Sequence, residues 1–250
     1  MVLQKDTDLK LLNTIDEKTK ILENLGLDML VVHPFTKEFS RLTATEFVRD
    51  ILVNQLRAKK IIIGYDHRFG RNRTANITDL KAFGNALDFE VEEISAKEVD
   101  SVSVSSTKIR KALEDGDIVT ANTFLGYDYM LTGTVKKGKG LGRKLNFPTA
   151  NLHIDAPYKL VPKNGVYVVD SQIEGQKVFG MMNIGVNPTV AGKDRSIEVH
   201  FFDFASDLYG HQLQVNCFAR LRDEHKFDSV DALKSQLKKD KEAALALISK

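Results

Sequence analysis

The residues best suited to do chemistry lie between positions 134 and 151. Glycines at alternate positions are interleaved there with lysines and an arginine. Glycine lets backbone amides approach an anion closely, and the cationic side chains bring positive charge to the same loop. The pattern therefore predicts a loop that binds a polyphosphate. The prediction rests on three glycines and two cations: Gly138, Gly140, Gly142, Arg143 and Lys144.

Other interpretations of this loop compete with a phosphate site. Residues 133–139 satisfy most of a P-loop pattern, but Gly140 stands where that motif needs Ser or Thr. A turn with proline follows instead of a helix, so we reject the P-loop. A mobile hairpin and a weak RNA-binding patch fit the loop residues about as well as a phosphate site does.

Three residues at the end of the loop, Pro148, Thr149 and Asn151, favour the phosphate site. Thr149 and Asn151 are two residues apart in an extended segment, so their side chains point the same way. A hydroxyl and an amide carbonyl are hard oxygen ligands of the kind that Mg²⁺ accepts beside substrate phosphates. The alternative is ordinary turn chemistry after Pro148.

Glu198 is a candidate general base. It alternates with Ile197 and Val199 in a strand-like segment, so Glu198 and His200 share the face opposite the aliphatic side chains. Strand alternation alone also explains a glutamate that faces solvent. The residues by themselves leave both interpretations open.

The elements that must position these residues differ between the two halves of the chain in their predicted secondary structure. In the first half, Thr14 with Glu17 and Thr43 with Glu46 have capping-box spacing. Helices alternating with short apolar strands predict a parallel sheet with covering helices. The predicted helices begin near residues 15, 44, 77, 106 and 117, and the predicted strands cover residues 29–32, 61–63 and 89–94.

The second half is predicted to be all-β with one closing helix. Strand-like segments are separated by Gly, Asn, Pro and Asp turns, which indicates an antiparallel barrel or sandwich. Apolar residues at helical spacing follow Asp228 and Ser229. A boundary near residue 125 divides the chain into domains 1–126 and 127–250. The predicted strands cover residues 129–135, 165–172, 177–185, 196–204 and 212–221.

Composition excludes several classes of protein. The 250 residues are 42% hydrophobic and 28% charged with a net charge of +2, which excludes a disordered chain and gives no reason to expect a nucleic-acid or membrane-surface binder. The single cysteine, Cys217, permits no internal disulfide, so we expect a reducing, cytoplasmic location. We find no secretion signal and no apolar run of the ~18–20 residues that a membrane span needs.

The second half resembles riboflavin kinase. Four segments match that family in order, and together they cover nearly all of residues 127–250. They are the glycine loop ending in Phe147-Pro148-Thr149-Ala150-Asn151, Asn183-Ile184-Gly185-Val186-Asn187-Pro188-Thr189, Ser196-Ile197-Glu198-Val199-His200, and Leu221-Arg222-Asp223-Glu224 with Lys226-Phe227-Asp228.

This resemblance implies a six-stranded antiparallel Greek-key barrel with a C-terminal helix. The implied reaction transfers the γ-phosphoryl group of ATP to the 5′-hydroxyl of riboflavin and makes FMN. Thr149 and Asn151 would hold Mg²⁺ and the ATP phosphates, with Pro148 and the 138–144 loop beside the nucleotide. Glu198 would accept the hydroxyl proton. Arg222 and Phe227 would lie beside the flavin.

The first half resembles the FMN adenylyltransferase domain of the bacterial bifunctional enzymes, a partial Rossmann-like α/β domain. The matching segments are 34–39, 64–70 and 104–113. Ser and Thr donors at a helix start favour phosphate, although the same residues also describe a well-capped surface helix. The residues implied are Asp66, Arg68 and Phe69 near the flavin of FMN, and Ser105, Ser106, Thr107 and Arg110 at the nucleotide.

One departure from that family is the absence of an H-x-G-H motif from the whole sequence. We therefore expect a shortened adenylyltransferase remnant without activity, with an exposed sheet edge. The preferred interpretation is a riboflavin kinase that takes small molecules and binds neither nucleic acid nor membrane, of unknown oligomeric state. The alternatives are a full bifunctional FAD synthetase and a non-enzymatic RNA-binding barrel.

Overall fold

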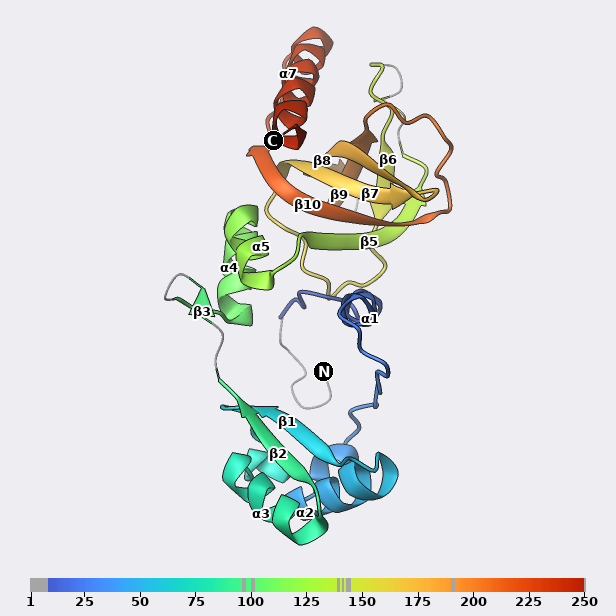
Figure 1. The fold of residues 1–250 in the computed structure, drawn as a ribbon. Coiled ribbons are helices and arrows are strands. Elements are labelled where there is room, and N and C mark those ends of the chain that lie inside the picture. The colour runs from blue at the N-terminus through green and yellow to red at the C-terminus, as the bar shows by residue number, and fades with distance from the viewer. Residues whose placement is uncertain are drawn as a thin grey trace. The chain divides into compact units, whose positions relative to one another are not determined.

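The computed structural model describes residues 9–95, 98–99, 102–138, 140, 142, 145–189 and 192–249. Within them the chain forms two compact units, which Figure 1 draws. The sheet unit comprises residues 29–104, and the barrel unit comprises residues 9–28 together with residues from 105 onward. By packing, residues 105–125 therefore belong with the barrel. The division at residue 126 stays a prediction for the domain boundary.

The barrel unit contains a closed barrel in which every neighbouring pair of strands is antiparallel. The strand order is β10-β5-β6-β9-β8-β7, which confirms the six-stranded antiparallel barrel. One of the six, the four-residue β6, was not among the strands predicted from turn signals. The strands are β5 (Tyr129–Lys136), β6 (Ala150–His153), β7 (Gly165–Ile173), β8 (Gln176–Thr189), β9 (Gly192–Phe201) and β10 (Gln212–Arg222).

Both faces of the barrel wall carry apolar side chains. On one face, every second residue of a strand points into the barrel; Tyr167 of β7 and Met182 of β8 lie opposite each other there and are fully buried, as expected for a barrel interior. The other face, which includes Val166, Val168 and Met181, packs against Leu145 and Phe147 and against the helix α7 (Val230–Ile248). Ser229 caps α7, which confirms the predicted start of this helix.

Three more helices belong to the barrel unit: α1 (Ile15–Asn24), α4 (Ser106–Asp115) and α5 (Ile118–Leu125). The predicted capping box of Thr14 and Glu17 begins α1. The Glu17 carboxylate also accepts hydrogen bonds from the Thr132 amide at 3.1 Å and from Lys159 Nζ at 2.6 Å. Glu17 and Lys159 side chains are 1% and 0% exposed, so α1 is joined to the barrel by a buried ion pair.

The sheet unit is built on two parallel strands, β1 (Lys60–Gly64) and β2 (Glu90–Ile94). Apolar residues from β1, from the helices and from the loops form its core, with Val48, Phe69 and Leu80 buried. The helices are α2 (Ala44–Glu46), the π-helix η2 (Phe47–Gln55) and α3 (Ile77–Leu87), with the short 3₁₀ turns η1 (Phe39–Arg41) and η3 (Arg71–Arg73); β3 (Glu98–Val99) pairs with β4 (Val102–Ser103).

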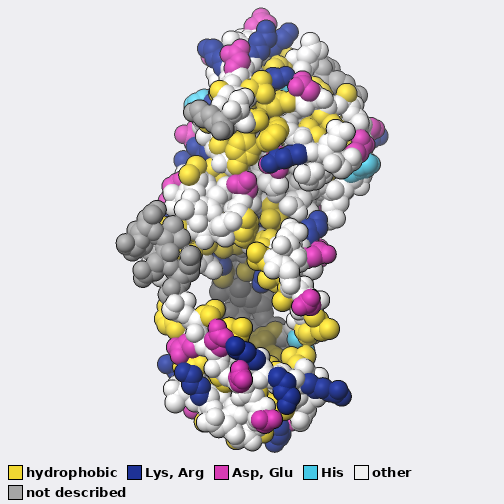
Figure 2. All heavy atoms as spheres, viewed as in Figure 1, with side chains coloured by type: hydrophobic (Ala, Val, Ile, Leu, Met, Phe, Trp, Pro, Cys, Tyr) yellow, Lys and Arg dark blue, Asp and Glu magenta, His cyan; other side chains and the backbone are white. Residues whose placement is uncertain are grey.

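One predicted strand of the sheet unit is wrong. Residues 29–32 form no strand, because in the described residues β1 pairs only with β2 and the segment has no neighbour with which to share a ladder. Met29, Val31 and Val32 are consequently 76%, 55% and 58% exposed. Hydrophobic side chains reach the surface of both units (Figure 2).

Candidate active site

A cavity of about 600 Å³ lies on the face of the barrel wall that α7 covers. Its walls come from the glycine loop, five strands, the segment after β10 and α7. The lining residues are Gly138, Gly140, Gly142, Leu145, Phe147, Thr149, Asn151, Val166, Met181, Asn183, Glu198, His200, Arg222, Glu224, His225, Phe227, Leu233, Leu237 and Asp240.

Five of these residues form one row across five strands. Asn151 on β6 lies opposite Glu198 on β9, and Glu198 lies opposite Asn183 on β8. Asn183 in turn lies opposite Val166 on β7, which lies opposite Arg222 on β10. Directly opposed residues on neighbouring strands project to the same face of the sheet. The strand register therefore brings a carboxylate, two carboxamides and a guanidinium to one wall of the cavity.

The hydroxyl of Thr149 is joined to the row, since its Oγ1 donates to Glu198 Oε2 at 3.1 Å. This bond fixes one carboxylate oxygen of Glu198 and leaves the other without a bond to Thr149. The glycine loop lies against the same residues. A Cβ at position 138 would overlap the Asn151 carboxamide, and one at position 142 would overlap the Phe147 carbonyl. Positions 138 and 142 therefore require glycine, because neighbouring atoms leave no room for a Cβ.

Arg222 lines the cavity, and its side chain is fixed by hydrogen bonds to Asp240 of α7. Its Nε and Nη2 donate to the Asp240 carboxylate at distances of 2.6–3.1 Å, and its Nη1 donates to the Asp223 carbonyl at 2.9 Å. The Asp240 side chain is only 4% exposed, and Gln236 Nε2 donates to it as well. The Arg222 guanidinium lies 5.8 Å from the centre of the Phe227 ring. One end of the cavity thus offers an aromatic ring beside a fixed cation.

His200 lies on the same face of β9 as Glu198 and is 9% exposed. Its Nδ1 is 2.8 Å from the Pro148 carbonyl, which can only accept, so Nδ1 carries the proton. Burial lowers the pKa of His200 below its usual value. Burial therefore favours the neutral form of the imidazole.

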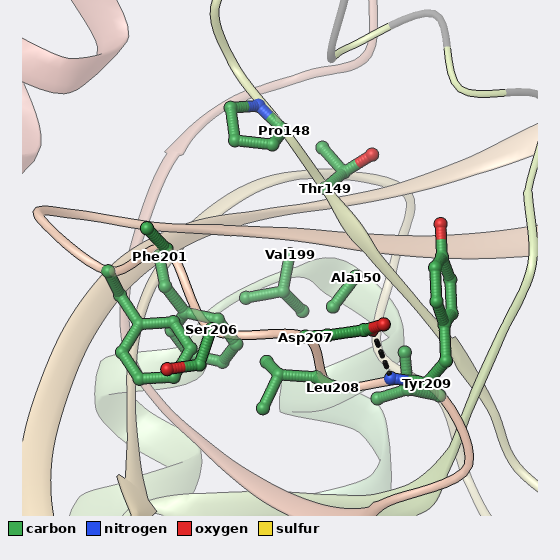
Figure 3. Close-up of a pocket in the computed structure, with 12 residues that line it drawn as sticks. Pro148, Thr149, Ala150, Val199, Phe201, Ser206, Asp207, Leu208 and Tyr209 are labelled. Carbon is green, nitrogen blue, oxygen red and sulfur yellow. Dashed lines mark hydrogen bonds between the residues drawn. The ribbon is translucent and has the colours of Figure 1, made fainter.

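A second, smaller cavity of about 180 Å³ adjoins the first, because Thr149 lines both. Its walls combine polar groups with apolar side chains, which include Val135, Val199 and Leu208. Figure 3 shows Pro148 and Thr149 on one side and Ser206–Tyr209 from the β9–β10 connection on the other. Within that connection the Tyr209 amide donates to Asp207 Oδ1 at 3.0 Å.

The structure gathers most of the residues singled out in the second half of the sequence. Pro148 lines the smaller cavity, while Arg143 and Lys144 lie outside the described residues. Several other residues line the larger cavity without having been predicted: Asn183, Glu224 and His225 lie in or beside matching segments but carried no separate signal, and Asp240 is brought there only by packing. The predicted residues that line the larger cavity are Gly138, Gly140, Gly142, Thr149, Asn151, Glu198, Arg222 and Phe227; lining residues that were not predicted include Asn183, Glu224, His225 and Asp240.

The residues singled out in the first half are divided between the two units: Asp66, Arg68 and Phe69 in the sheet unit, and Ser105, Ser106, Thr107 and Arg110 in the barrel unit. Phe69 is buried in the core of the sheet unit. Ser105 Oγ accepts from the Lys108 amide at 3.3 Å and caps α4, and Arg110 Nε donates to the Lys10 carbonyl at 2.8 Å.

Among the described residues, no cluster of three or more His, Cys, Asp or Glu could bind a metal by itself. Nor does any helix in that part of the chain combine the length and hydrophobicity that a membrane span requires.

Comparison with known proteins gives matches over both halves of the chain. Residues 125–248 match the family model for riboflavin kinase, and residues 1–108 match that for FAD synthetase. A bifunctional riboflavin kinase/FMN adenylyltransferase of Listeria monocytogenes is 36% identical over 96% of this chain and 76% of its own length. The Escherichia coli K12 protein of the same name is 37% identical over 92% and 73%. A crystal structure described as a macrolide-efflux protein from Streptococcus pneumoniae has a TM-score of 0.86 and 36% identity, covering 97% of this chain and 79% of the solved one.

Proposed function

Because this chain belongs to the family of bifunctional riboflavin kinase/FMN adenylyltransferases, we propose that its barrel unit transfers the γ-phosphoryl group of ATP to the 5′-hydroxyl of riboflavin. The products are FMN and ADP. The observation that carries the proposal is the row of Asn151, Glu198, Asn183 and Arg222 on one cavity, with Thr149 bonded to Glu198. Phosphoryl transfer needs positioning and a base at the attacking hydroxyl, and this row offers both.

Glu198 is the general base in this proposal. Its carboxylate takes the proton of the riboflavin 5′-hydroxyl as that oxygen attacks the γ-phosphorus, and the bond from the γ-phosphorus to the bridging oxygen of ADP breaks. The hydrogen bond from Thr149 orients one carboxylate oxygen and leaves the other to face the substrate. A positioned base of this kind contributes about 10²–10⁴-fold to the rate.

The residues present fit a Mg²⁺ ion that arrives with ATP. The Thr149 hydroxyl and the Asn151 carboxamide are neutral oxygen donors beside Glu198, and Mg²⁺ usually takes few protein ligands when substrate phosphates supply the rest. Thr149 and Asn151 would hold the ion, which would neutralise charge on the transferring phosphoryl group. The close packing of Gly138 on Asn151 supports the glycine loop as the cover for the phosphates.

The two joined cavities support an order for the substrates along the wall. We assign the base of ATP to the smaller cavity, where Val135, Val199 and Leu208 offer apolar contacts and Thr149 borders the larger cavity. Riboflavin occupies the far end of the larger cavity, where the Phe227 ring can stack on an aromatic ligand and Arg222 supplies a cation. The 5′-hydroxyl and the γ-phosphate then meet at Glu198.

The assay incubates the protein with riboflavin, ATP and Mg²⁺ and separates the flavins by chromatography. We expect FMN from the wild-type protein, and a loss of at least about 100-fold in kcat for Glu198→Gln, because the amide cannot accept the proton. Thr149→Val should also lose most of its activity. Glu114→Gln, a change at an exposed glutamate of the same unit, is the matched control. Wild-type turnover in Glu198→Gln would contradict the role of Glu198.

The same chromatogram tests a second activity, because a family model for FAD synthetase matches residues 1–108. FAD as a product would show that FMN is adenylylated in this chain. We expect FMN as the end product, since the sequence contains no H-x-G-H motif.

A cytoplasmic location is supported by the single cysteine, which is buried and free.

A further inference from the structure

The backbone pairing between β6 and β9 stops just short of the residue that contacts Glu198. The paired residues are Asn151 with Glu198 and Ala150 with Val199. The next residues back along the chain are Thr149 and Pro148. Proline has no backbone N–H and cannot extend the ladder as a donor. Thr149 therefore lies between the end of a strand and a residue that cannot join it.

Two side chains of β9 hold this segment where the backbone does not. Glu198 accepts from Thr149 Oγ1 at 3.1 Å, and His200 Nδ1 donates to the Pro148 carbonyl at 2.8 Å. Glu198 and His200 are two residues apart on one strand, so both project to the same face. Consecutive residues of the loop are thus held by alternate residues of β9.

The imidazole of His200 is itself fixed on both sides. The centre of its ring lies 5.1 Å from that of Phe147 and 5.8 Å from that of Phe202, with the ring planes steeply inclined in both pairs. Phe147 and Phe202 belong to the apolar cluster under α7. Upstream, the Phe147 amide donates to the Gly142 carbonyl at 2.9 Å, which closes the end of the glycine loop. His200 is therefore packed between the loop and the barrel wall.

We propose that His200 is a positioning residue for the ATP side of the site. Its Nδ1–H bond to Pro148 fixes the turn that carries Thr149, and its other ring nitrogen takes no part in the reaction. The inference rests on the proposed function, in which Thr149 meets the phosphates. It adds His200 to the site as a residue that acts only through its hydrogen bond to the Pro148 carbonyl.

Three substitutions separate this role from direct contact with a substrate. The Asn amide nitrogen occupies the same place along the side chain as Nδ1, so His200→Asn keeps the donor to Pro148. The Gln amide nitrogen corresponds to Nε2, so His200→Gln keeps a polar group facing the cavity but loses that donor. His200→Phe keeps the ring packing and removes both nitrogens. Thermal unfolding of each variant first checks that the protein is folded.

The readouts are KM for ATP, KM for riboflavin, kcat, and the affinity for ADP measured by calorimetry with and without Mg²⁺. We expect His200→Phe and His200→Gln to raise KM for ATP and to weaken ADP binding about tenfold, because the Pro148 carbonyl loses its donor and the turn that carries Thr149 is no longer fixed. KM for riboflavin should change less than about threefold. His200→Asn should restore both ATP-side values to within about threefold of the wild type.

Two results would overturn the proposal. Wild-type behaviour of His200→Gln with impairment of His200→Asn would show that Nε2 acts on the contents of the cavity. Equal wild-type behaviour of all three variants would show that the bond to Pro148 positions nothing. Absence of FMN with the wild-type protein would overturn the proposed kinase function alone, because the ADP affinities would still rank the three variants.

Discussion

At the scale of single residues, the wall of the larger cavity depends on groups that are bonded before any substrate arrives. Arg222 is the clearest case, because Asp240 binds its guanidinium through two nitrogens and the Asp223 carbonyl binds the third. A long side chain that is fixed in advance loses little conformational freedom when a ligand binds. We infer that Asp240 orients Arg222 beside Phe227.

The variant Asp240→Asn tests this arrangement. It leaves a largely buried cation without its counter-charge, which typically costs about 3–5 kcal/mol of stability. We expect a lower unfolding midpoint in urea and a KM for riboflavin that rises more than KM for ATP. The control is Glu242→Gln on the exposed side of the same helix. Equal increases in both KM values would contradict a specific effect on the flavin end.

Cys217 gives a second prediction at this scale. It lies on β10 between β5 and β7, is fully buried, and burial raises the pKa of its thiol to about 12. The thiolate is the reactive form, so the native protein should not react with a thiol reagent at pH 8. Labelling should begin only as urea opens the barrel. Rapid labelling of the native protein would contradict this burial.

Site roles were predicted from the sequence for residues whose types point to a reaction, such as Thr149, Asn151 and Glu198, and these three line one cavity. Asn183 was visible within a matching segment but carried no separate signal. Asp240 lies on a helix whose lysines were predicted to form a solvated face, and only packing shows that its side chain is 4% exposed. Residues of this kind depend on long-range closure of the barrel, which local spacing does not encode.

At the scale of elements, α1 is attached to the barrel by charge as well as by packing. Lys159 Nζ donates to Glu17 and to the Leu12 carbonyl, each at 2.6 Å, and lies 4.3 Å from the centre of the Tyr129 ring. Burial lowers the pKa of Lys159, although Glu17 favours its charged form. Glu17 therefore offsets part of the effect of burial on the Lys159 ammonium.

Glu17→Gln should destabilise the barrel unit by about 3–5 kcal/mol, because it leaves the Lys159 ammonium buried without a counter-charge. Chemical unfolding followed by circular dichroism measures the difference. Glu23→Gln, at an exposed position of the same helix, should change stability by less than about 0.5 kcal/mol. Equal stability of the two variants would show that the ion pair contributes little.

Local signals predicted the helix starts of both units. The capping boxes of Thr14 and Thr43 are present with both reciprocal bonds. After Thr43, however, the helix continues as the π-helix η2 (Phe47–Gln55), whose i→i+5 bonding leaves no mark in the apolar spacing. The predicted strand over residues 29–32 failed for a different reason, since a strand needs a neighbour and its own residues cannot supply one.

At the scale of the whole molecule, the chain enters the barrel unit twice. Residues 9–28 belong to it, residues 29–104 form the sheet unit, and the barrel unit resumes at Ser105. The first passage is bonded along its length, with the Leu11 amide donating to the Tyr158 carbonyl at 2.7 Å and the Leu160 amide to the Leu11 carbonyl at 2.9 Å. These backbone bonds add a short parallel bridge beside the Glu17 pair.

A cut between the first passage and the sheet unit tests how firmly the first passage is held. A specific protease site placed after Asp28 would release a peptide of residues 1–28 if only covalent linkage retained it. We expect the peptide to elute with the remainder in gel filtration, and to separate when Glu17 is Gln. Separation of the wild-type peptide would contradict this expectation.

The pairing of Glu17 with Lys159 also has a consequence for synthesis. The two residues are 142 positions apart, so the ribosome releases the acidic partner long before the basic one. Until Lys159 has been made, the Glu17 carboxylate of α1 has no counter-charge with which to be buried. We therefore expect α1 to dock on the barrel unit only after Lys159 has been synthesised.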